Sequence, residues 1–306
     1  AAAHNSGGKV IFQVRGKVPR HSMKAREVRI PAALVDAVVV DATQRQGYDL
    51  VYDAALSGQD RRDDPEPPQP AFSSRLVIAR RAQQELHDNA VINFGFGIPD
   101  QIAKLIDRDG HAERYFQTIE HGTYGGRLMD GDLFGYAMNP SCMIDGPSQF
   151  DFYSGGGLDI AFLGFGEIDA AGNVNVSKLA GNTVGPGGFI DIAQNARKVV
   201  FCGTFDTGGA RLETGDGTLR VTSHGRIPKL VEKVDQITFS GPQASVQGQH
   251  VIYVTERAVF ELREDGVHLV EIAPGIDLQA DVLDRMGFTP RMESPLSEMN
   301  SGLFKE

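Results

Sequence analysis

The sequence lacks tryptophan altogether and contains only two cysteines in 306 residues. Two cysteines are too few for a disulfide framework, and neither Cys142 nor Cys202 stands at a spacing typical of metal ligands. We therefore expect both cysteines to be reduced, buried thiols in a cytoplasmic protein. We expect no metal site.

Basic residues are also fewer than acidic ones. The sequence contains 30 Lys and Arg and 40 Asp and Glu, which give a formal net charge of −10. A nucleic-acid or anionic-membrane partner requires a basic face, so neither is expected. No apolar run reaches the length of a membrane span, and no basic-then-apolar leader is present. A phosphorylated ligand needs only a local cluster of donors and is not excluded.

The order of the segments predicts an α/β protein in two parts. A strand at 9–15 and a buried, apolar strand at 33–40 precede a charged, proline-rich run at 59–70 that has nothing to bury. We expect 1–60 to end a first domain, 61–72 to be a linker, and 73–306 to form a second domain.

The second part alternates helical and strand patterns. We expect a helix capped by Ser73 or Ser74 whose Arg80 and Arg81 reach solvent. We also expect a helix that ends near Met286. Further expectations are a strand that opens the segment 90–100, a buried strand after the glycine loop in 154–167, and another at 198–205. We also expect a hairpin at 251–262 and an ordinary tail at 292–306.

The most informative stretch is a short buried strand, 116–119, that ends in Glu120. In open α/β sheets, ligands bind beyond the carboxyl ends of the strands, which is where Glu120 would lie. Gly122, Gly125 and Gly126 follow, and they would let another backbone segment or a ligand come close to the carboxylate.

Two glycine-rich turns precede helices elsewhere. One is Gly95, Phe96, Gly97, Ile98 and Pro99, and the other contains Gly187 and Gly188. Such turns present backbone N–H groups that suit a phosphate or an oxyanion. A carboxylate between two donor sites could act as a nucleophile towards a thioester, or as a general base. These residues alone leave both roles open.

Several segments resemble the family I coenzyme A transferases, and most closely the propionate/acetate branch that fuses both half-subunits in one chain. The resemblance rests on Glu120-His121-Gly122 with Gly125-Gly126, and it continues through 150–159, 172–178, 187–190 and 201–205. Residues 74–290 resemble the nucleophile-bearing domain, and 9–60 resemble only the end of the first domain.

The resemblance implies an open, mainly parallel sheet with helices on both faces, as in ribose-phosphate isomerase. It implies that Glu120 attacks a short-chain acyl-CoA and becomes a glutamyl-CoA thioester in ping-pong exchange with a free carboxylate. Gly95 to Pro99 would line the CoA site, and Gly187 and Gly188 would supply an oxyanion donor. Coenzyme A would be a substrate, with no permanently bound cofactor.

Two departures from the family pattern affect this interpretation. The Gly-Gly-Phe run of the first domain is absent, and His121 stands where relatives carry small residues or Asn. We therefore expect a fragment, or one piece of a nicked or two-chain enzyme, whose N-terminal domain is another polypeptide. The resemblance also suggests a homo-oligomer. An acyl-CoA hydrolase and a non-catalytic module that senses a metabolite remain as alternatives.

Overall fold

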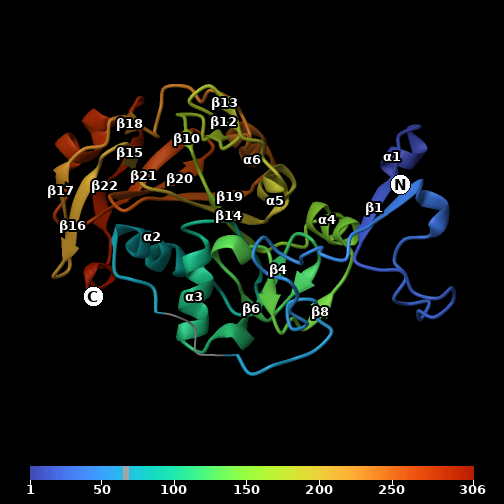
Figure 1. The fold of residues 1–306 in the computed structure, drawn as a ribbon. Coiled ribbons are helices and arrows are strands. Elements are labelled where there is room, and N and C mark those ends of the chain that lie inside the picture. Colours follow the sequence, from blue (N-terminus) through green and yellow to red (C-terminus); the bar gives the residue numbers. More distant parts are fainter. Residues whose placement is uncertain (65–68) are drawn as a thin grey trace. The chain divides into compact units, whose positions relative to one another are not determined.

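Figure 1 shows a computed structural model of the protein, which describes residues 1–64 and 69–306. These residues form two compact units, Ala1–Ala54 and Ala55–Glu306. Part of the predicted linker, 65–68, lies outside the described residues. The assignment of the units to domains of a CoA-transferase stays a prediction.

The first unit is a parallel pair of strands, β1 (Ile11–Val14) and β2 (Ala37–Val40), with α1 (Ala2–Asn5) and the 3₁₀ turn η1 (Ala32–Leu34). The strand predicted at 33–40 is present as β2 over its second half, but the prediction that it is buried is wrong. Val38 and Val39 are 52% and 50% exposed, because within this unit the described residues place no second layer over the pair.

The second unit is organised by a ten-stranded sheet in which the central strands are parallel and both flanks contain antiparallel pairs. In order across the sheet, the strands are β22 (Arg291–Glu298), β21 (Gly266–Ile272), β20 (Ala258–Arg263), β19 (His250–Val254), β14 (Lys198–Cys202), β9 (Ile160–Gly164), β3 (Val91–Phe94), β4 (Phe116–Ile119), β5 (Thr123–Tyr124) and β8 (Cys142–Met143).

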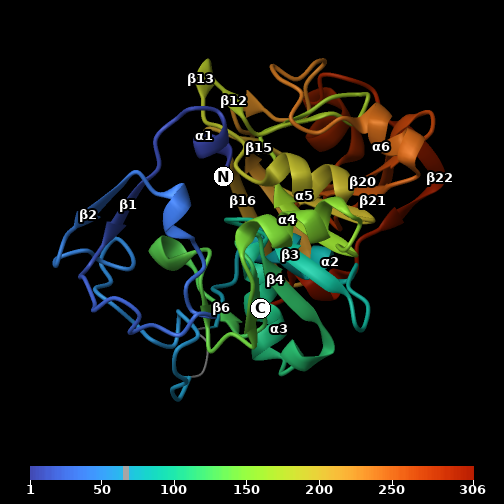
Figure 2. The same cartoon turned by 90° about the vertical axis from the view of Figure 1, so that its right-hand side faces the viewer.

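Helices cover both faces of the sheet (Figures 1 and 2). One core joins the sheet to α2 (Ser74–Gln83), α3 (Asp100–Arg108) and the 3₁₀ turn η6 (Ser301–Phe304). The other joins it to α4 (Gly146–Ser154), α5 (Phe189–Asn195) and α6 (Gly241–Gln247). Successive strand residues point to opposite faces, which is why one strand feeds both cores. The predicted α/β class, with helices on both faces of a mainly parallel sheet, is confirmed.

Short elements complete the unit. Five two-stranded pairs are β6 (Arg127–Leu128) with β7 (Ala137–Met138), β10 (Glu167–Ile168) with β11 (Val174–Asn175), β12 (Lys178–Leu179) with β13 (Asn182–Thr183), β15 (Asp206–Thr207) with β18 (Ile227–Pro228), and β16 (Arg211–Gly215) with β17 (Thr218–Ser223). Short helical turns are η2 (Ala112–Arg114), η3 (Gly131–Leu133), η4 (Leu278–Val282) and η5 (Leu283–Arg285).

Several local predictions are wrong. The tail at 292–306 contains edge strand β22 and the buried Phe304. Arg81 is buried, because it pairs with Glu85 and Glu271. Cys142 is exposed, whereas Cys202 is buried as predicted. In place of one helix ending near Met286, the chain forms the π-helical η4 and the 3₁₀ turn η5. None of the described helices is long and apolar enough to cross a membrane.

Candidate functional site

Glu120 lies at the carboxyl end of β4, at the edge where the parallel strands β3, β9 and β14 also end. Its side chain is half-buried and lines a cavity of about 280 Å³. Residues from both predicted glycine turns, Gly95 and Phe96 on one side and Gly187 and Gly188 on the other, line the same cavity. The structure therefore brings together the three features that the sequence singled out.

The glycines after Glu120 allow the chain to fold back on itself. Gly122 has φ +108°, and a Cβ there would clash with the backbone of Ile144. A Cβ at Gly126 would likewise meet the backbone of Met138. The close approach predicted here is thus made by the protein's own backbone, and it fixes the turn between β4 and β5.

Asn93, which the sequence interpretation missed, is the side chain that contacts the Glu120 carboxylate. It is 1% exposed at the end of β3, and its Nδ2 lies 3.4 Å from Glu120 Oε2. The same nitrogen lies 3.4 Å from the carbonyl oxygen of Thr118 and 3.5 Å from the hydroxyl of Tyr153. An amide nitrogen has two hydrogens for these three acceptors, so the contact with Glu120 can strengthen when the others loosen.

The first residues of the turn from Gly95 to Pro99 line the cavity, and Ile98 packs in the core. Gly95 N–H donates to the carbonyl of Phe162 at 2.7 Å, and Gly97 N–H donates to the Asp100 carboxylate at 3.1 Å. These two N–H groups are therefore not free, contrary to the expectation. Gly97, Ile98 and Pro99 lie outside the lining of the cavity, and Ile98 belongs to the core beneath α3.

The second turn keeps its donors available. Among the described residues, no acceptor is found for the N–H groups of Gly187 and Gly188. A Cβ at Gly188 would lie 2.9 Å from the ring of Phe150, so glycine lets this turn pack against α4. Two N–H groups without acceptors beside a carboxylate can stabilise a transient negative oxygen.

The remaining cavity wall is apolar and largely aromatic. Phe96 is 65% exposed, and its ring meets Phe134 edge-on with centroids 5.3 Å apart. The other contributors are Phe94, Leu163, Gly164, Val176, Pro186, Phe189 and Ile192. Glu120 is the one charged side chain among the described residues that line this cavity, so its carboxylate faces a weakly polar environment.

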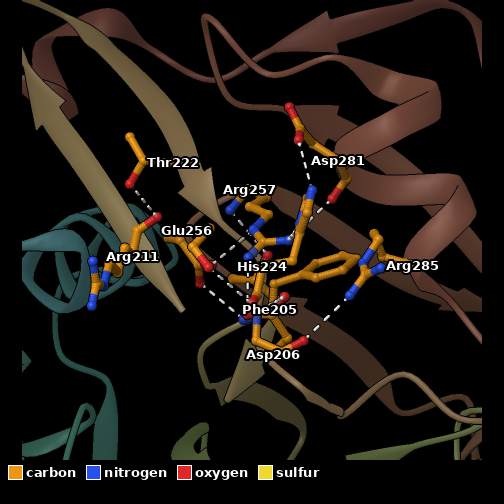
Figure 3. Close-up of polar contacts among 12 residues, drawn as sticks. Phe205, Asp206, Arg211, Thr222, His224, Glu256, Arg257, Asp281 and Arg285 are labelled. Atoms are coloured by element: carbon orange, nitrogen blue, oxygen red, sulfur yellow. Dashed lines mark hydrogen bonds and ion pairs between the residues drawn. The ribbon is translucent and has the colours of Figure 1, made fainter. Parts of the chain in front are cut away.

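A second polar cluster surrounds Arg257, which follows β19 and is fully buried (Figure 3). Its guanidinium lies 2.9 Å from Asp206 and 3.3 Å from Glu256, and it also contacts His224 at 3.3 Å. Burial raises the pKa of Glu256 above its ordinary value, although Arg257 opposes that shift. None of these residues lines the Glu120 cavity, so the cluster holds elements together and is not part of the candidate site.

The two histidines noted in the sequence also lie outside the lining of the cavity. His121 Nε2 is 3.3 Å from the hydroxyl of Thr123, and His250 pairs with Glu261 at 3.0 Å. Within residues 1–64 and 69–306, no group of three or more His, Cys, Asp or Glu side chains is arranged to hold a metal ion.

Comparison with known proteins bears directly on this geometry. No protein-family profile matches the chain. Acetate CoA-transferase YdiF of Escherichia coli O157:H7 is 44% identical over 304 residues, which are 99% of this chain and 57% of the relative. A structure of that acyl-CoA transferase in a thioester complex with CoA superposes with a TM-score of 0.89 at 43% identity, covering 98% of this chain and 56% of the other.

The fold is that of the CoA-transferases. The sequence resembles family I of these enzymes over its whole length, and the caffeate CoA-transferase of Acetobacterium woodii is also 44% identical, over 60% of its own length. The chain thus spans a little over half of these relatives. The beta subunit of the acetate CoA-transferase of Escherichia coli K12 is 26% identical and is matched over 89% of its length by 68% of this chain.

Proposed function

We propose that this chain carries the nucleophile of a CoA-transferase that exchanges coenzyme A between a short-chain acyl-CoA, such as acetyl- or propionyl-CoA, and a free carboxylate. The observation that supports the proposal most directly is the single cavity shared by Glu120 and the Gly187–Gly188 turn. The similarity to acetate and caffeate CoA-transferases agrees with it.

The proposed reaction needs four displacements. A Glu120 oxygen attacks the thioester carbon, and the C–S bond breaks to give an acyl-glutamyl anhydride and CoA thiolate. The thiolate attacks Cδ of Glu120, which frees the first acid and leaves a glutamyl-CoA thioester. The second acid attacks Cδ and expels CoA thiolate. The thiolate then takes the new acyl group and restores the carboxylate.

Each displacement passes through a tetrahedral oxyanion, which forms at the acyl carbon in the first and last steps and at Cδ of Glu120 in the two middle steps. The N–H groups of Gly187 and Gly188 would donate to one of these oxygens. No electron is gained or lost over the cycle, so no redox cofactor is required. The turn from Gly95 to Pro99 would line the path of the CoA arm, with Phe96 at the cavity.

Trapping of the intermediate tests the proposal. After incubation with propionyl-CoA and reduction by borohydride, we expect Glu120 to be converted to the alcohol in its peptide, as measured by mass spectrometry. Glu120→Gln should abolish exchange and labelling, because an amide cannot form the anhydride. Glu113→Gln, a change at an exposed carboxylate, is the matched control. Turnover with an unmodified Glu120 would contradict the mechanism, and CoA release without any acceptor acid would favour a hydrolase.

We further propose that the complete enzyme contains an N-terminal domain, on this or on a second polypeptide, and that the assembly is a homo-oligomer. The share of the curated relatives that this chain spans, 57% and 60%, supports the first part. Mass analysis of the purified enzyme under native conditions would show whether a second polypeptide accompanies this one and how many copies assemble.

A further inference from the structure

Two basic side chains near the candidate site form no direct ion pair among the described residues, although Asp100 interacts electrostatically with the first and Glu256 with the second. They are Arg75, at the start of α2, and Lys229, which follows β18. Neither makes an ion pair or a side-chain hydrogen bond within 1–64 and 69–306, whereas the neighbouring Arg257 is paired with Asp206 and Glu256. In a chain of net charge −10, two cations that lie close together without a direct ion pair leave local positive charge available to an anion.

Lys229 lies over the carboxyl ends of β9 and β14. Its Nζ is 4.0 Å from the ring centroid of Phe165, which follows β9. A Cβ on Gly203, which follows β14, would lie 2.8 Å from Nζ, so glycine makes room for the ammonium group. Burial lowers the pKa of Lys229 to about 8, and the charge of Arg75 lowers it further, while Glu256 opposes the shift. A bound anion would stabilise the charged form.

Arg75 lies beside Gly97 of the Gly95–Gly97 turn. Its Nη2 is 3.7 Å from the position that a Cβ of Gly97 would occupy. The side chain is exposed, and it stands in the first turn of α2, where the helix dipole disfavours a cation. An anion at this place would interact favourably with both the guanidinium and the helix.

The turn separates these cations from the nucleophile. Phe96 and Gly164 line the Glu120 cavity. The residue after each of them contacts a cation, because Gly97 lies beside Arg75 and the ring of Phe165 lies under Lys229. Between β4 and the β9–β14 pair lie two to three strand spacings, or roughly 10–14 Å. Coenzyme A has the same layout, because a long pantetheine arm separates its thiol from its phosphate groups.

We propose that Arg75 and Lys229 form an anion subsite that holds phosphate groups of CoA while its sulfur reaches Glu120. The identity of the ligand rests on the proposed function, whereas the observed position of the two cations does not depend on it. The local positive charge would offset the repulsion between a polyanionic substrate and an acidic protein.

Acyl-CoA and acyl-pantetheine, which lacks the phosphates, separate this role from a structural one. For Arg75→Gln and Lys229→Gln in the complete enzyme, we expect kcat/KM with propionyl-CoA to fall about 10- to 100-fold, as for loss of a charge-assisted hydrogen bond. The fall with propionyl-pantetheine should be far smaller. Lys229→Arg should retain most of the preference for CoA. Arg211→Gln, at another exposed arginine, is the control (Figure 3).

Equal losses with the two thioesters would assign both side chains to structure and overturn the proposal, as would no loss with either. Calorimetric titration with CoA keeps the test independent of turnover. If exchange is absent with every thioester, the proposed function fails. The subsite would still be supported by CoA binding that weakens in both variants, and it would be overturned by binding that does not change.

Discussion

The side-chain amide of Asn93 lies 3.4 Å from the carboxylate of Glu120, and the two residues end neighbouring parallel strands. Because Asn93 is buried and also contacts Tyr153 and the backbone of Thr118, its position is set by the core. Because the core holds Asn93 in place, its contact fixes the position of the Glu120 carboxylate.

Replacement of this amide should reduce catalysis more than binding. We expect Asn93→Ala to lower kcat by about 10- to 100-fold, because a hydrogen bond to a charged group is lost, with a smaller change in KM. Steady-state exchange kinetics and the yield of labelled Glu120 measure the effect. Asn195→Ala, at a half-buried amide that donates to the carbonyl of Asp191 and does not line the cavity, is the control. A fall in kcat/KM that is accompanied by a fall in thermal stability would instead indicate a structural defect.

A half-buried carboxyl in α3 should make stability depend on pH. Burial raises the pKa of Asp107 from 3.8 to about 6, partly opposed by Arg127. The folded state therefore binds this proton more tightly than the unfolded state, so stability falls as pH rises from about 4 to 6.

Asp107→Asn removes that dependence. We expect the variant to be more stable than the wild type above pH 6 by about 1–2 kcal/mol, with partial exposure limiting the gain. The two proteins should converge below pH 4. Urea unfolding across this pH range measures the difference, and Asp216→Asn on an exposed turn should have no effect. A variant less stable than the wild type at pH 8 would contradict this view of Asp107.

The C-terminal segment should contribute strongly to stability. Phe304 is fully buried in the core formed with α2 and α3, so Phe304→Ala should lower the free energy of unfolding by about 3–5 kcal/mol. Phe116→Ala, at a ring that is mostly exposed, should cost much less. Chemical denaturation compares the two, and similar costs would show that the segment is peripheral.

Sequence reasoning succeeded where local pattern determines structure. The apolar runs gave the central strands, Ser73 was predicted as a possible cap of α2, and the turn at 255–257 gave the β19–β20 hairpin. Because parallel strands end at one edge of a sheet, Glu120 lies in one cavity with Gly95, Phe96, Gly187 and Gly188, whereas Gly97, Ile98 and Pro99 lie outside it.

The failures involve partners that are distant in sequence. Arg81 is buried because Glu271 reaches it from β21, and β22 is a strand because β21 offers a free edge. Asn93 could have been noticed as a polar residue inside an apolar run, but its contact with Glu120 depends on the pairing of β3 with β4. Local periodicity contains none of this information.

The turn at Gly122 has an evolutionary consequence. Any side chain there would collide with the backbone of Ile144 and displace the loop that begins at Glu120. In a saturation mutagenesis library selected for growth, position 122 should tolerate as few replacements as position 120, although it contributes no atom to the chemistry. Few variants would survive at such a position because the neighbouring main chain leaves no space for a side chain.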